Sequence, residues 1–156
     1  MPSRRDLIKM TRDELRAYIR KQKTLIIVSN GPNGYPHPLP MNFDVDDEDR
    51  YYVTTFRKSQ KVLNFQRDPK AALLIESGEE YAQLRAVLAY ATAEVIDDYE
   101  TTLNFMRQLQ QKETAQGHEV PGSDEILKAT AAKRVLIRFT PHEFISWDHT
   151  KLGGKY

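Results

Sequence analysis

The sequence predicts a mainly β protein, a small β-barrel of six or seven mainly antiparallel strands with a few helices. Short runs rich in β-branched and aromatic residues recur along the chain, separated by turns such as residues 31–34 and 77–80. Pro36, Pro38 and Pro40 share one parity within a strand, so one lateral edge of that strand lacks three N–H donors. An edge strand or the open seam of a barrel tolerates this loss, whereas a strand paired on both sides does not.

The first 22 residues are expected to form a loosely held lead-in over residues 1–10 and then a helix. Thr11 and Glu14 have the spacing of a capping box, in which each side chain accepts from the backbone N–H of the other. The basic face of this helix is expected to be solvated. Its apolar face comprises Leu15, Tyr18 and Ile19.

Two strands flank the acidic turn in the first half of the chain. The proline-rich strand at residues 35–43 follows a buried strand at 24–30. After the acidic turn, aromatic and β-branched residues alternate over 51–55, which favours a half-buried strand. The remaining strands are expected at residues 71–75, 81–95, 135–140 and 144–147.

Residues 97–132 are expected to form a helical insertion before the last strands. Asp98 can cap one helix, which runs to about Thr114, and Ser123 can cap a second, short one. At 156 residues and 18.1 kDa, the chain is expected to form a single domain over residues 1–156, and no internal repeat is present.

Composition excludes several classes of function. A net charge of +1 from 23 basic and 22 acidic residues gives no global attraction to nucleic acid. The absence of cysteine excludes disulfide and thiolate chemistry, and the four histidines lack the spacing of a metal site. No apolar run approaches the roughly 20 residues of a membrane span, and no signal-peptide core is present. We therefore expect a cytoplasmic protein that binds neither nucleic acid nor membrane.

The clearest functional signal lies between Arg50 and Glu76. Two hydroxyls end a strand, a basic turn follows, and a short helix starts there and stops at Asp68-Pro69. A helix N-terminus with hydroxyls and cations suits an anion, although a solvated basic loop would have a similar composition. The groups concerned are Thr54, Thr55, Arg57, Lys58, Ser59 and Lys61.

This order of features resembles the flavin-binding split-barrel family of the pyridoxamine 5′-phosphate oxidase type. The resemblance extends from about Lys23 to the C-terminus and is most specific over residues 54–76. It implies a split β-barrel that binds flavin mononucleotide (FMN) in a cleft between the subunits of a homodimer. The implied activity is that of a flavin-dependent oxidoreductase, which transfers hydride between the flavin and a small organic substrate.

The resemblance also implies roles for individual residues. Gln60 stands where pyridoxamine phosphate oxidases usually have arginine, and Arg57 or Lys58 would supply the missing charge. The resemblance makes Thr54 and Thr55 flavin contacts, and Ser59 and Lys61 phosphate ligands.

The flavin ring would be contacted by the backbone of Pro40, Met41 and Asn42, and by Trp147 across the dimer interface. The tail after Trp147 lacks the longer region with which pyridoxamine phosphate oxidases hold their substrate, so the vitamin is not the expected substrate. No catalytic residue can be named. Two alternatives remain open: a reductase that uses the deazaflavin coenzyme F-420 on the same fold, and a non-catalytic protein that binds flavin or haem.

Overall fold

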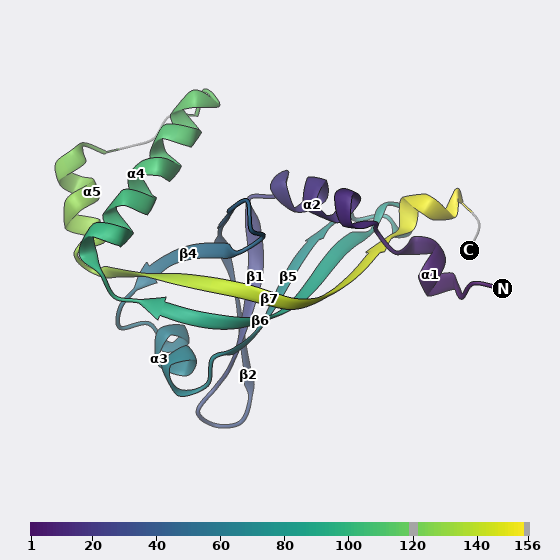
Figure 1. Cartoon of the computed structure of the whole chain (residues 1–156), viewed down its shortest axis with the longest axis horizontal. Helices are drawn as coiled ribbons and strands as arrows, with labels where there is room; N and C mark the ends of the chain where they lie inside the picture. The colour runs from purple at the N-terminus through teal and green to yellow at the C-terminus, as the bar shows by residue number, and fades with distance from the viewer. Residues whose placement is uncertain (119–121, 155–156) are drawn as a thin grey trace.

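The computed structural model describes residues 1–118 and 122–154 (Figure 1). Within this part of the chain, seven strands form one antiparallel sheet. The strands are β1 (Thr24–Asn30), β2 (Pro36–Asn42), β3 (Asp44–Val45), β4 (Tyr51–Phe56), β5 (Lys70–Ser77), β6 (Arg85–Ile96) and β7 (Arg134–Asp148).

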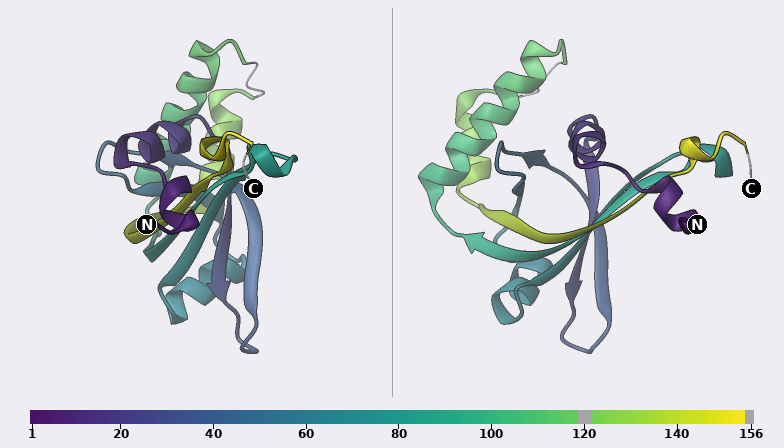
Figure 2. Two further views of the ribbon diagram at one scale, coloured as in Figure 1. Left: turned by 90° about the vertical axis from the view of Figure 1, so that its right-hand side faces the viewer. Right: turned by 45° about the vertical axis from the view of Figure 1, so that its right-hand side comes forward.

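The order across the sheet is β2-β1-β5-β6-β7-β4-β3. The sheet curls strongly, and the two views of Figure 2 show that it forms half of a barrel. The predicted fold, a mainly β split barrel with antiparallel strands, is therefore confirmed. The helices are α1 (Arg4–Ile8), α2 (Arg12–Arg20), α3 (Gln60–Arg67), α4 (Tyr99–Ala115) and α5 (Asp124–Ala131), with 3-10 turns η1 (Tyr81–Gln83) and η2 (His149–Leu152).

Two groups of helices lie at opposite ends of the sheet. α4 and α5 pack together where β6 ends and β7 begins, whereas α1 and η2 lie together at the far end of β7 (Figure 1). The predicted caps of the two helices in the insertion are present, because Asp98 accepts from the Thr101 N–H and Ser123 from the Ile126 N–H. Among the described residues, no helix combines the length and the apolar character needed to cross a bilayer.

The apolar core lies against one face of the curled sheet. On β1, β4 and β5 every second side chain is buried, as expected for strands with one face toward the core. α3 adds Val62 and Phe65 to this core, and the Phe65 ring meets Phe139 edge-on with 5.4 Å between centroids. Full burial of a side chain of this size contributes about 1.5–3 kcal/mol, so α3 is fixed firmly to the sheet.

The proline-rich strand β2 is an edge strand, paired with β1 alone. The Phe43 N–H donates to the Lys23 carbonyl at 3.2 Å, so the odd-numbered positions of this segment turn their backbone groups toward β1. The even-numbered prolines therefore direct their nitrogens and carbonyls away from the sheet. The prediction that they lie at an edge or seam is confirmed.

The observed bounds of β6 and β7 differ from the predicted strand boundaries. β7 is one continuous strand, not two, because it passes Pro141 with a bulge: Tyr90 pairs with Glu143 and Ala91 with Pro141, which leaves His142 unopposed. Similarly, β6 begins at Arg85, later than predicted, because residues 81–83 form η1. Alternation alone does not reveal a bulge, since the extra residue shifts the pattern without ending the strand.

The N-terminal segment is attached to the sheet, contrary to the expectation of a loose lead-in. α1 has its own capping box between Ser3 and Asp6, and the Met10 N–H donates to the Ser146 hydroxyl at 3.0 Å. The predicted capping box of α2, between Thr11 and Glu14, is present.

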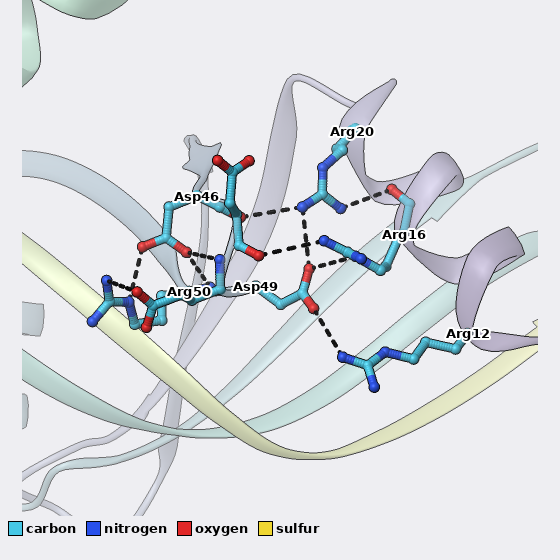
Figure 3. Close-up of polar contacts among 8 residues, drawn as sticks. Arg12, Arg16, Arg20, Asp46, Asp49 and Arg50 are labelled. Carbon is cyan, nitrogen blue, oxygen red and sulfur yellow. Dashed lines mark hydrogen bonds and ion pairs between the residues drawn. The ribbon is translucent and has the colours of Figure 1, made fainter.

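The basic face of α2 is not simply solvated, which corrects the second expectation for this helix. Arg12, Arg16 and Arg20 lie on successive turns and all reach the Asp49 carboxylate, at 3.8, 3.0 and 3.1 Å (Figure 3). Asp49 lies in the turn between β3 and β4 with a positive φ of 61°, a conformation that Asp and Asn tolerate better than most residues. One carboxylate thus links the whole length of α2 to the sheet.

Asp49→Asn should lower the free energy of unfolding by about 1 kcal/mol, because it removes the shared carboxylate while asparagine keeps the backbone conformation. Urea denaturation at low salt measures the loss, which should shrink in 1 M NaCl because salt screens these pairs. Asp47→Asn, in an exposed neighbour, is the matched control. Equal effects of the two substitutions would contradict the role of Asp49.

Candidate functional site

The predicted anion-binding turn lies between β4 and α3. Ser59 is the N-cap of α3 as predicted, but its hydroxyl makes no capping hydrogen bond to the helix backbone. It lies instead 3.4 Å from the Thr55 hydroxyl. The first-turn N–H groups of α3 therefore receive no side-chain cap from Ser59, which leaves them available to an acceptor from outside the helix.

Lys61 lies in the first turn of α3, and only 7% of its surface is exposed. Within residues 1–118 and 122–154, its ammonium group has neither a hydrogen-bond partner nor a carboxylate partner. Burial, together with the neighbouring charge of Arg134, lowers the pKa of Lys61. The positive end of the helix dipole also disfavours a cation at this position. Three effects thus oppose this charge, and each of them would favour a bound anion.

Arg134 begins β7 and pairs with Phe56 in the register of β4 and β7. Its Nη1 donates to the carbonyl and the hydroxyl of Thr54, at 3.2 and 3.4 Å, and the guanidinium lies 4.6 Å from the centre of the Phe56 ring. The buried Nε has no acceptor, and no carboxylate in the described part of the chain pairs with this arginine. Burial lowers the pKa of Arg134.

The two basic residues of the turn itself differ in their surroundings. Arg57 forms a bidentate pair with Asp97, with its Nη2 at 2.9 Å, and its Nη1 donates to the Ala132 carbonyl. The hydrogen bonds from Arg57 lower the pKa of Asp97. Lys58 is exposed. The Arg57 guanidinium is therefore already used to join the turn to β6 and to the start of β7.

A buried amide holds α3 in place. Asn64 is fully buried, and its Nδ2 donates to the Ser29 hydroxyl of β1 at 2.9 Å. Its Oδ1 accepts from Gln60 Nε2 at 2.8 Å. The position of Ser59 and Lys61 thus follows from a satisfied polar contact between α3 and the sheet. The Gln60 side chain is held against Asn64, one turn further along the same helix.

A groove of about 510 Å³ lies at the seam of the barrel, where the edge strand β2 faces β4 and α4 forms one wall. This volume is within the range of small-molecule sites. The groove brings together four of the predicted residues, namely Pro40, Met41 and Asn42 of β2 and Thr54 of β4. The lining comprises Thr24, Pro40, Met41, Asn42, Thr54, Phe105, Leu109 and Arg134.

Four further predicted residues lie outside the groove, three beside it and one far from it. Thr55, Ser59 and Lys61 adjoin the groove through Thr54 and Arg134 but do not line it. Trp147 lies near the other end of β7 from Arg134, thirteen positions along the strand (134 to 147), or on the order of 40 Å. A single chain therefore does not bring Trp147 to the groove. No group of three or more potential metal ligands occurs among the described residues.

Sequence reasoning missed Arg134 and the wall formed by α4. Arg134 carries no local signal, because only the register of β4 with β7 places it beside Thr54. Phe105 and Leu109 belong to the apolar stripe of α4, and a stripe of this kind is equally typical of a helix face that packs on a core.

The curled antiparallel sheet and the groove at its seam define a split-barrel protein. The chain belongs to the pyridoxamine 5′-phosphate oxidase family, whose model matches residues 11–148. No curated protein matches the chain.

Solved structures share this fold. A conserved hypothetical protein from Mycobacterium tuberculosis is 29% identical, with a TM-score of 0.83 over 99% of this chain and 95% of that one. The haem storage protein HutZ from Vibrio cholerae is 16% identical, with a TM-score of 0.65 over 86% of this chain and 94% of that one. A protein described as an F420 reductase is 21% identical, with a TM-score of 0.63 over 83% and 94%.

Lys61→Met should stabilise the ligand-free protein by about 0.5–2 kcal/mol at pH 7, because it replaces a buried, unpaired charge with an apolar side chain of similar length. The gain should shrink as the pH rises. The folded chain loses the Lys61 proton at a lower pH than the unfolded chain does, so wild-type stability increases across that interval.

Urea denaturation at pH 7 and at about pH 9.5 tests this expectation, with the exposed Lys58→Met as control. A Lys61→Met variant less stable than wild type at pH 7 would show that the lysine has a stabilising partner.

Proposed function

We propose that this protein is an FMN-dependent oxidoreductase that acts on a small organic substrate as a homodimer. The observation that carries the proposal is the buried Lys61 charge at the start of α3, beside two hydroxyls and without a carboxylate partner in the described chain. Family membership supports it, because flavin-dependent oxidoreductases occur in this family.

The phosphate of FMN would be held by the first-turn N–H groups of α3, the Ser59 hydroxyl and Lys61. A phosphate dianion at this helix start meets unpaired donors, the positive end of the helix dipole and a cation in one place. Thr55 lies within reach of Ser59 and would orient its hydroxyl.

The flavin ring would lie in the groove against the outward edge of β2. Because the prolines turn away from β1, this edge offers the carbonyls of Pro38 and Pro40 and the N–H of Asn42. Such acceptors and a donor suit the pyrimidine end of a flavin, which carries one N–H between two carbonyls. Phe105 and Leu109 supply an apolar wall on the other side.

Bound FMN would supply the redox chemistry, the transfer of hydride at its N5 atom. The chain's part is to bind the phosphate, orient the ring and keep water from its apolar face. No described residue is assigned as an acid or base.

The homodimer is supported by a row of apolar side chains on the face of the sheet opposite the core. The strand register places five such residues side by side across five strands, and each is at least partly exposed. A continuous apolar row on an open sheet face marks a protein interface. The residues, from β2 to β7, are Pro40, Ile26, Leu74, Leu88 and Ile145.

A second copy would also complete the flavin site. Ala86 pairs with Trp147 in the register of β6 and β7, next to Leu88 and Ile145, so Trp147 adjoins the apolar row. Two-fold packing of this face on itself could bring Trp147 of one copy to the groove of the other.

The absorbance spectrum of the purified protein tests the proposed cofactor. FMN should give two visible bands and mass spectrometry should identify it after release. A single band at shorter wavelength would indicate the deazaflavin F-420 instead, and an intense Soret band would indicate haem. Reoxidation of the reduced protein by an added acceptor would then separate an enzyme from a storage protein.

Lys61→Met should weaken FMN binding about tenfold to a hundredfold, because a charged hydrogen bond contributes about 1.5–3 kcal/mol. Riboflavin, which lacks the phosphate, should bind the variant and wild type alike, as titration by flavin fluorescence would measure. Lys70→Met, at an exposed position at the start of β5, is the control and should leave both affinities unchanged. An equal loss for FMN and riboflavin would refute the assignment of the phosphate.

Leu74→Asp should convert the dimer to monomers at micromolar concentration, because it places a charge at the centre of the apolar row. Light scattering measures the mass, and circular dichroism checks the fold. Leu63→Asp, at a position 50% exposed on α3 and outside the row, should remain dimeric. A Leu74→Asp variant with undiminished dimer affinity would place the interface elsewhere.

A further inference from the structure

Lys61 and Arg134 form what we name the cationic pair, two positive charges from distant parts of the chain. Lys61 comes from the start of α3 and Arg134 from the start of β7. Hydrogen bonds connect the two places: Arg134 Nη1 donates to Thr54, and the hydroxyl of the next residue, Thr55, lies 3.4 Å from that of Ser59, the N-cap two residues before Lys61. Neither has a carboxylate partner within residues 1–118 and 122–154.

This absence of a counter-ion contrasts with other arginines on the sheet and its flanking helices. Four of them lie within 3.3 Å of a carboxylate oxygen, although their side chains are 30–41% exposed and water already screens part of their charge. Arg134, which is also partly buried, has none in the described part of the chain. The four paired arginines are Arg57, Arg85, Arg107 and Arg138.

The surroundings of Arg134 fix its guanidinium but leave part of it unsatisfied. The Phe56 ring lies against its face and Thr54 accepts from Nη1, which together hold the group at the groove lining. Nε is buried and has no acceptor. An oriented guanidinium with a free donor is suited to a phosphate, which accepts from two of its nitrogens at once.

Gln60 explains why a second cation is needed. It occupies the position at which pyridoxamine phosphate oxidases usually have arginine, and its amide donates to Asn64 within the same helix. Arg57, the neighbouring alternative, is bound to Asp97. The helix and its turn therefore bring only Lys61 to the start of α3 as a buried cation.

We propose that Arg134 replaces this missing arginine, so that a phosphate dianion bound at the start of α3 contacts Lys61 and Arg134 together. The identification of that dianion with the phosphate of FMN rests on the proposed function. The anion site itself rests on the burial of Lys61, the unsatisfied Nε of Arg134, their connection through Thr54, Thr55 and Ser59, and the lack of a carboxylate partner for either in the described residues.

Arg134→Gln tests the assignment through binding alone. FMN affinity should fall about tenfold to a hundredfold, whereas riboflavin affinity should stay within twofold of wild type. Lys70→Gln removes an exposed positive charge at the start of β5 without touching the pair and should change FMN affinity less than twofold. Unchanged FMN affinity in Arg134→Gln, or an equal loss of riboflavin affinity, would overturn the proposal.

A second substitution provides a rescue. Gln60→Arg in the Arg134→Gln background restores a cation at the usual position of the family and should recover most of the lost FMN affinity. If the double variant binds FMN no better than Arg134→Gln, Arg134 is not the replacement for that arginine.

Pyrophosphate, used as a probe without flavin, separates this inference from the proposed function. It should raise the melting temperature of the wild-type protein and not that of Arg134→Gln. If FMN fails to bind but this difference persists, the anion site stands and the FMN assignment falls. If neither FMN nor pyrophosphate stabilises the wild type, the inference is wrong.

Discussion

The fold depends on the double pairing of β7. Residues 136–139 of this strand pair with β6 on one side and with β4 on the other, whereas the rest of its length pairs with one neighbour at a time. The strand therefore joins the two halves of the curled sheet. The pairing with β4 fixes its first residue, Arg134, beside Thr54. Trp147, the second-to-last residue of β7, lies at the opposite end of the strand. One strand thus positions both Arg134 at the groove and Trp147 at the far end of the sheet.

Local sequence patterns predicted the local features correctly. The bounds of β1, the capping box of α2 and the caps of α4 and α5 depend on residues at most a few positions apart. The parity of three prolines placed β2 at an edge, because a missing N–H has the same consequence in any antiparallel sheet. The bulge at His142 and the partner of the α2 arginines depend on register between distant segments, which a single sequence does not specify.

In the candidate site, too, the residues close together in the sequence were predictable and the residue brought in by strand pairing was not. Thr54, Ser59 and Lys61 were proposed from their order along the chain, whereas Arg134 lies 73 positions from Lys61 and is brought beside Thr54 only by the pairing of β4 with β7. A buried lysine and a partly buried arginine without a counter-ion in the described residues work against folding. A protein that keeps such an arrangement retains a cost in stability that ligand binding can relieve, as is common where a site is organised before its ligand arrives.

The three prolines of β2 also bear on how the barrel stays open. A strand edge with free N–H and C=O groups attracts any other edge within reach, including that of β3 or of a second molecule. At Pro36, Pro38 and Pro40 the edge can accept hydrogen bonds but cannot donate them, so a ladder cannot propagate along it. The two edge strands therefore cannot pair across the seam to close the barrel. The carbonyls of β2 remain free to accept hydrogen bonds from a small molecule that carries an N–H or O–H group.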